Sequence, residues 1–303
     1  MAARILQNVF SALQWGSFYS IIALGYCLVY GVLRLINFAH GDIFMAASYF
    51  AFFIATALLG AITGGGPVVF VLTLVGTMVV TALLGITIER VAYRPLRRKG
   101  VNRLYVVITA LMVGFILENG NLALLGASSK RFPVIIPERI WEIGPVVLTN
   151  LKVLVIAAAL AVFGILQFIV QKTVFGMSMR AISYDKFAIP LMGIPVNGVI
   201  TFTFALGSGL AAVAGILFGM SYPVLGPYMG MIIGWKAFIA AVVGGIGDIK
   251  GAFLGGFILG FIEIFIAAFF PSSFKDLVSF VILLIILSIR PTGFFGVAKS
   301  TKI

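Results

Sequence analysis

Long runs of apolar residues, separated by short polar stretches, make up most of this chain. No Asp, Glu, Lys or Arg occurs between Arg4 and Arg34, between Asp42 and Glu89, or between Lys186 and Lys236. A helix that crosses a bilayer needs roughly 20 apolar residues, so the second and third gaps are each long enough for two crossings. The pattern predicts an all-α polytopic membrane protein with about eight or nine transmembrane or re-entrant helices.

A cluster of glycines before Pro67 marks the turn between the second and third apolar segments. A broken or re-entrant helix is expected at the short segment 232–247 or at the connection from Gly31 to Asp42. The whole chain, 1–303, is expected to form a single transmembrane domain. The expected helices are 9–31, 43–62, 67–88, 105–125, 151–171, 198–221, 232–247, 252–270 and 276–290.

The composition agrees with a membrane protein, since 62% of the residues are hydrophobic and 10% are charged, against about 25% charged in soluble domains. A net charge of +12 would suit nucleic-acid binding, but the cations cluster beside apolar segments, as the positive-inside rule expects of cytoplasmic loops. We therefore expect membrane lipid around the chain and no nucleic-acid partner. The basic loop 89–104, the loop 172–197 and the C-terminus are predicted to be cytoplasmic, with 126–150 outside.

Nine full crossings would place the N-terminus outside, and one failed crossing would reverse that side. The N-terminal run lacks a small-residue cleavage site, so it is expected to be a retained helix rather than a signal peptide. Cys27 is the one cysteine, which excludes a disulfide framework.

Glycines cluster where a helix is expected to be interrupted. Gly244, Gly245 and Gly247 precede Asp248, and an unwound backbone of this kind is tolerated in a membrane where it lines a cavity. Gly41-Asp42-Ile43 recurs as Gly247-Asp248-Ile249, which predicts an internal repeat of two halves with a substrate path between them.

Ionisable residues in membrane segments are costly and therefore point to function or to specific pairing. Asn37, His40 and Asp42 lie where the first segment ends, either as part of the substrate path or as a helix end capped by Asp42. Glu118 lies deeper and belongs either to the path or to a hydrogen bond inside the bundle, and Glu263 is similar.

Catalytic chemistry finds no support in the sequence. The chain has one histidine, no metal-ligand spacing and no G-x-S-x-G elbow, so no catalytic or metal-binding residues are expected. A Walker A motif is also absent, so we expect no enzyme activity and an ATP site, if one is used, on another polypeptide.

The loop from Thr173 to Pro195 carries apolar residues at spacings of three and four, among them Ala181, Tyr184 and Leu191. This spacing predicts a short amphipathic helix that docks a soluble partner outside the bilayer.

Three motifs in chain order carry a resemblance to a known family. They are Ala23-Leu24-Gly25-Tyr26 with Ile36-Asn37-Phe38-Ala39-His40-Gly41, then Leu191-Met192-Gly193-Ile194 with Thr203-Phe204-Ala205-Leu206-Gly207-Ser208, and then Ala241-Val242-Val243-Gly244-Gly245-Ile246-Gly247. The chain resembles the permease subunits of branched-chain amino-acid ABC transporters of the LivH type over nearly its whole length.

The resemblance implies a heteromeric importer in the bacterial inner membrane, with a second permease, two cytoplasmic ATPases that use ATP, and an extracytoplasmic substrate-binding protein. The loop 172–197 would contact an ATPase, and Pro190 would end or kink its helix. The implied ATPase-coupling residues are Gly176, Arg180, Tyr184, Asp185, Ala188, Leu191, Met192 and Gly193. The expected substrate-path residues are Asn37, His40, Asp42, Glu118, Gly244, Gly245 and Gly247.

Two alternatives remain at this point. Related permeases serve urea and short-chain amides. An ion-coupled secondary transporter acting alone would also use interrupted helices and small-residue packing, although few buried carboxylates are present for proton or sodium coupling.

Overall fold

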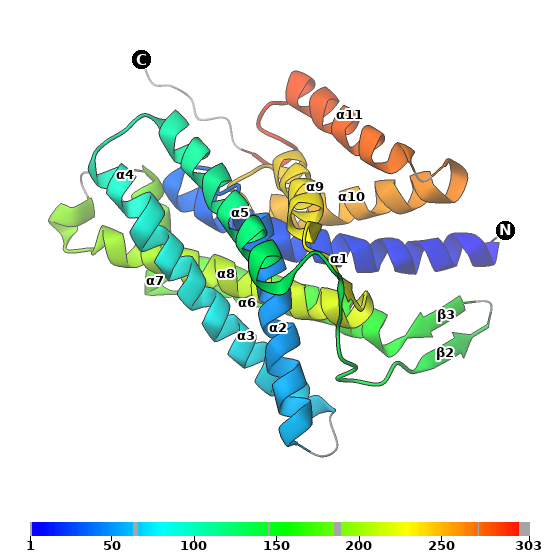
Figure 1. Ribbon diagram of the computed structural model, residues 1–303. Helices are drawn as coiled ribbons and strands as arrows, with labels where there is room; N and C mark the ends of the chain where they lie inside the picture. The colour runs from blue at the N-terminus through cyan, green and yellow to red at the C-terminus, as the bar shows by residue number, and fades with distance from the viewer. Residues whose placement is uncertain (1, 63–65, 145, 185–188, 272, 297–303) are drawn as a thin grey trace.

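The computed structural model describes residues 2–62, 66–144, 146–184, 189–271 and 273–296. Each expected apolar segment coincides with a helix, and the prediction of an all-helical membrane fold is confirmed apart from four short strands (Figure 1). The main helices are α1 (Ala2–Leu33), α2 (His40–Ala61), α3 (Pro67–Ile88), α5 (Arg103–Leu125), α6 (Asn150–Lys172), α8 (Val196–Ser221), α9 (Met229–Gly244), α10 (Ile249–Phe269) and α11 (Phe274–Ile289).

Seven helices among the described residues are long and apolar enough to cross a membrane: α1, α2, α3 with its helical continuation, α5, α6, α8 and α10. The α9 helix has 16 residues, about 24 Å at 1.5 Å per residue. The hydrocarbon core is about 30 Å thick, so α9 is too short to cross it unaided. It corresponds to the segment 232–247 that was expected to be the weak crossing.

The centre of the bundle is formed by α1 and α8, which are buried over most of their length. The α1 and α10 helices touch along small residues. A Cβ added to Gly16 of α1 would lie 2.8 Å from the Cα of Phe257 in α10. Glycine at such positions allows the two helix backbones to approach, which is how membrane helices gain packing energy without a hydrophobic driving force.

The connections separate onto two sides of the bundle. On one side the Gln7 side chain, near the start of α1, donates to and accepts from the backbone of Val147. Val147 lies in a hairpin of β2 (Ile140–Ile143) and β3 (Val146–Thr149), seen beside the N-terminus in Figure 1. A second short pair joins β1 (Lys130–Arg131) to β4 (Val224–Leu225). The N-terminal end of α1 therefore lies on the same side as the connection 126–150.

The basic segments lie together on the opposite side. The expected loop 89–104 is helical over most of its length, as η1 (Glu89–Tyr93) and α4 (Arg94–Arg98) continue α3. Buried Glu89 pairs with Arg94 at 2.6 Å and with Arg97 at 3.2 Å. Arg97 also donates to the Asn197 side chain at the start of α8. This network fixes the basic segment against the end of the loop 172–197.

Candidate functional site

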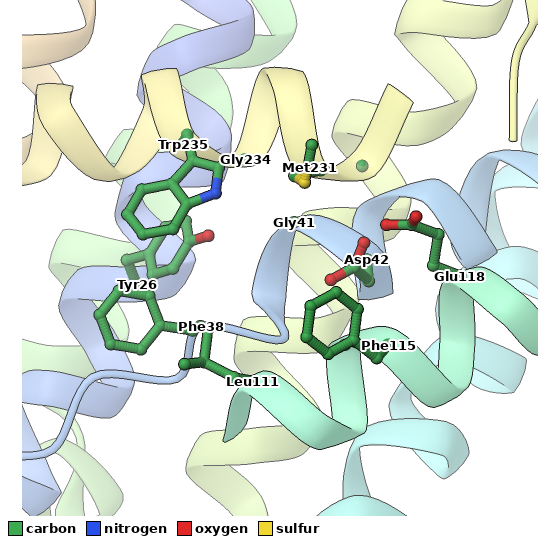
Figure 2. A pocket seen from close by; sticks show the side chains of 12 residues that line it. Tyr26, Phe38, Gly41, Asp42, Leu111, Phe115, Glu118, Met231, Gly234 and Trp235 are labelled. Atoms are coloured by element: carbon green, nitrogen blue, oxygen red, sulfur yellow. The ribbon is translucent and has the colours of Figure 1, made fainter. Parts of the chain in front are cut away.

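A cavity of about 180 Å³ lies between α2, α5 and α9, with one wall from α1. Figure 2 shows its acidic and aromatic side chains converging on the space between these helices. The lining residues are Tyr26, Phe38, Gly41, Asp42, Leu111, Gly114, Phe115, Glu118, Gly230, Met231, Gly234 and Trp235. Two of the predicted substrate-path side chains, Asp42 and Glu118, therefore come together in one pocket.

Asp42 lies in the first turn of α2 and is 8% exposed. The predicted capping role is wrong, because the N-cap is Ala39 and no side chain caps the helix. The position near the N-terminus of α2 still favours a negative charge, since that end of a helix is electropositive. The Oδ1 atom of Asp42 has no hydrogen-bond partner among the described residues.

Two glycines on neighbouring helices make room for this carboxylate. A Cβ at Gly114 of α5 would lie 2.5 Å from Oδ2 of Asp42, and one at Gly230 of α9 would lie 2.8 Å from Oδ1. The crossing of α2 and α9 is equally close, because a Cβ on Gly41 would lie 2.7 Å from the Cα of Gly234. Larger side chains at these positions would displace the acid or separate the helices.

Glu118 of α5 lies beside Asp42 in the same pocket, close enough for the two carboxylates to repel each other (Figure 2). The hydrogen bond inside the bundle that was considered for Glu118 is not formed, and Glu118 has no ion pair among the described residues. Charged groups at membrane depth normally have a partner. The pocket thus presents negative charge without a cation to balance it.

Aromatic side chains form the wall opposite the acids. The rings of Phe38 and Trp235 have centroids 5.5 Å apart, and Phe38 also contacts Phe238 at 5.4 Å. The rim is partly open, with Phe115 51% exposed and Trp235 40% exposed. These aromatic residues were not predicted from the sequence, although Gly230 and Gly234, four residues apart beside Trp235, give a small-residue signal for a close helix crossing.

Asn37 and His40 lie near this pocket but do not line it. The amide oxygen of Asn37 accepts a hydrogen bond from the Tyr93 hydroxyl at 2.7 Å, which ties the connection between α1 and α2 to η1. His40 is 1% exposed and packs edge-on against Tyr26, with ring centroids 4.8 Å apart. Both residues hold the start of α2 in place from outside the pocket.

Gly244, Gly245 and Gly247 lie at the turn between α9 and α10, away from the carboxylates. Gly245 and Gly247 have φ angles of 114° and 101°, which glycine adopts readily. The turn is also packed, since the amide of Phe295 donates to the Gly244 carbonyl at 3.0 Å. Gly247 lines a separate cavity of about 500 Å³ on the side of the basic segments.

The two Gly-Asp-Ile sequences differ in structure. Asp248 caps α10 by accepting from the amide of Gly251 at 2.7 Å, whereas Asp42 lies inside α2. The internal repeat stays a prediction.

The segment 172–197 contains α7 (Val174–Tyr184) and a 3₁₀ turn, η2 (Ile189–Met192). Gly176, Met179 and Ile182 face the bundle, and Arg180 donates to the carbonyl of Val170. Facing outward are Val174 (73% exposed), Met177 (58%), Tyr184 (81%), Leu191 (90%) and Met192 (74%). Gly193 follows with a φ of 74°. Asp185 and Ala188 lie outside the described residues.

An ion cluster around buried Glu263, missed from the sequence except for that residue, joins α1, α9, α10 and α11. Lys236 lies 3.0 Å from Glu263 and 2.7 Å from Asp276. Glu263 also accepts from the Tyr19 hydroxyl at 2.6 Å and from Ser279 at 3.1 Å. Glu263 is therefore satisfied, unlike Asp42 and Glu118. No group of three His, Cys, Asp or Glu residues that could hold a metal occurs within the described part of the chain.

Comparison with known proteins assigns the chain to a family. Residues 8–287 match the family described as "Branched-chain amino acid transport system / permease component". The chain is 39% identical over 303 residues to the high-affinity branched-chain amino acid transport system permease protein BraD of Pseudomonas aeruginosa, covering 98% of each chain. It is 38% identical over 304 residues to LivH of Escherichia coli K12, which has the same description, covering 98% of this chain and 97% of LivH.

A more distant relative is the probable branched-chain amino acid transport permease protein LivH of Methanocaldococcus jannaschii, 28% identical over 248 residues that span 80% of this chain and 74% of the relative. No solved structure matches this chain at a significant level. The predicted resemblance is confirmed, and this chain belongs to the membrane permease family of branched-chain amino-acid transport systems, whose members are transport subunits rather than enzymes.

Proposed function

We propose that this chain forms one half of the translocation path of an ABC importer for branched-chain amino acids in the bacterial inner membrane. A second permease subunit would supply the other half, two cytoplasmic ATPases would use ATP, and an extracytoplasmic binding protein would deliver substrate. The observation that carries this proposal is the match to relatives named as branched-chain amino-acid permeases over 98% of this chain.

The distribution of charge supports an orientation with the C-terminus in the cytoplasm. The basic segments 89–104 and 172–197 share one side of the bundle with the end of the described chain, and cytoplasmic loops are enriched in Lys and Arg. The connection 126–150 and the N-terminus would then face outside.

The segment 172–197 is the proposed ATPase contact. Its outward side chains, including Met177, Tyr184 and Leu191, form an exposed apolar surface next to Arg180. Exposed apolar patches of this kind mark interaction sites. Closure of the ATPases on ATP would shift the population of the two permeases between inward- and outward-facing arrangements through this contact.

The path through the membrane is proposed to pass the pocket of Asp42 and Glu118. An acid without a partner at this depth costs free energy, and such residues in membrane proteins usually serve function. Asn37 and His40 hold the start of its helix in place. The glycine turn at Gly244–Gly247 would lie further along the path, beside the cytoplasmic cavity.

Co-purification and uptake test this function. The complete complex in vesicles should take up leucine only with ATP, and neither urea nor short-chain amides should compete. Arg180→Glu and Gly193→Trp should each abolish ATPase co-purification and uptake while membrane insertion stays normal. Unchanged ATPase association in both variants removes the docking role, and uptake by this chain alone favours the secondary transporter.

A further inference from the structure

The pocket between α2, α5 and α9 has two chemically different ends. Asp42 and Glu118 give one end a negative charge, and Phe38 and Trp235 give the other an aromatic surface (Figure 2). No Lys, Arg or His is among the residues that line the pocket. A ligand that complements it must carry a positive group at one end and an apolar group at the other.

The acidic end is built to receive a hydrogen-bond donor. Asp42 is more than nine-tenths buried, and its Oδ1 atom lacks a partner among the described residues. Gly114 and Gly230 leave the space around this carboxylate that any larger side chain would fill. Because a buried ionised acid without a partner is strongly unfavourable, a cationic donor gains both charge compensation and a charge-assisted hydrogen bond.

The size of the cavity limits the ligand to a small molecule. Its 180 Å³ equals the liquid volume of roughly six waters at about 30 Å³ each. Pockets for drug-sized ligands are larger, roughly 300–1,000 Å³. A hydrated hard cation fits less well than an organic amine, because calcium and similar ions take about 6–8 oxygen ligands and most of this wall is carbon.

We propose that this pocket is a binding site for the transported amino acid, in which Asp42 and Glu118 hold the α-ammonium group and the branched side chain packs against Phe38 and Trp235. This inference rests on the proposed function and deepens it. The lining offers no cation for the substrate carboxylate, so the ammonium group is the feature that this chain recognises. An amine without the carboxylate should therefore bind, and a carboxylic acid without the amine should not.

Cysteine protection tests the site directly, because Cys27 is the one cysteine of the chain and is buried. In a Cys27→Ser background, Leu111→Cys and Met231→Cys place reporters on α5 and α9 at the pocket, and Leu124→Cys places an 85% exposed control on α5 away from it. The permease–ATPase complex in vesicles, without binding protein, is alkylated with N-ethylmaleimide, and labelling of this chain is followed by mass.

Three ligands discriminate the chemistry: leucine, 3-methylbutylamine and 4-methylpentanoate. Leucine and the amine should slow labelling of the pocket cysteines about tenfold at ten times the Kd, when roughly a tenth of the sites are empty. The acid should not slow it, and the control cysteine should be labelled at the same rate throughout. Asp42→Asn should weaken protection by roughly tenfold or more in ligand concentration, as should Glu118→Gln if the first variant fails to assemble.

Protection by 4-methylpentanoate equal to that by the amine, or no protection of either reporter by any ligand, overturns the proposal. The proposed function is scored separately by ATP-driven leucine uptake in vesicles that also contain the binding protein. Uptake without protection leaves the importer intact and removes this site. Protection without ATP-driven uptake removes the importer and leaves an amine-binding pocket.

Discussion

Replacement of Lys236 by methionine should destabilise the bundle more than any change at its exposed partner. Lys236 is 16% exposed and its partner Glu263 is 5% exposed, so the Lys236→Met variant leaves a buried carboxylate without its cation. Breaking such a buried pair from one side costs about 3–5 kcal/mol. Two neutral donors, Tyr19 and Ser279, still reach Glu263, which places the expected cost near the lower value, about 3 kcal/mol.

Two matched variants distinguish the cost of leaving the Glu263 carboxylate unpaired from the cost of losing any charge in this cluster. Asp276 is 64% exposed, so Asp276→Asn should cost no more than about 1 kcal/mol. The double variant Lys236→Met with Glu263→Met removes both charges, and apolar replacement of a whole buried pair is often neutral or stabilising. The double variant should therefore recover most of the stability that the single lysine change loses.

Thermal denaturation of the purified complex in detergent, followed by loss of monodisperse protein, measures these differences. A loss of about 3 kcal/mol corresponds to a midpoint lower by roughly 6 °C or more, given about 2–4 °C per kcal/mol for chains of 150–250 residues. Equal midpoints for Lys236→Met and Asp276→Asn, or a double variant less stable than Lys236→Met, would refute the reasoning that burial of Glu263 sets the cost.

Two further predictions concern other parts of the chain. Gly114→Ala should lower leucine uptake at least about tenfold, because its Cβ would meet the Asp42 carboxylate. Gly120→Ala on the same helix meets nothing within 4 Å and should transport normally. Similar rates of leucine uptake for both variants would count against the pocket. Glu89→Gln should lower the free energy of unfolding by about 1–3 kcal/mol, because this fully buried acid holds Arg94 and Arg97. The control Thr87→Ala removes an exposed hydroxyl and should cost less than about 0.5 kcal/mol. The same denaturation assay measures both, and a Glu89→Gln variant as stable as Thr87→Ala would contradict this role.

The membrane helices could be predicted because length and lack of charge decide them. The gap between Asp42 and Glu89 contains α2 and α3, as its length predicts, whereas the gap between Lys186 and Lys236 contains α8 and only the first half of α9, the short segment expected to be the weak crossing. The boundaries moved by a few residues where polar residues such as His40 and Asn150 join a helix end.

The site could be predicted only in part, because it depends on which helix faces meet. Asp42 and Glu118 were recognisable as costly charges in apolar surroundings, and the structure brings them into one pocket. The opposite wall comes from Trp235 and Phe38. In a chain with 28 phenylalanines, an aromatic residue does not by itself predict a binding site. Glu263 looked like Glu118 in sequence, and only the contact with Lys236 distinguishes a balanced charge from an unbalanced one.

Two consecutive residues of α9 contact different parts of the structure. Trp235 lines the pocket and Lys236 pairs with α10 and α11, because adjacent side chains on a helix point about 100° apart. Any tilt of α9 that widened the pocket would have to carry α10 and α11 with it or rupture the ion pair. The α5 helix has no such anchor, since its buried residues are the single row Val106, Ala110 and Gly114. Any change in the width of this pocket is therefore easiest by displacement of α5 against a stationary α9.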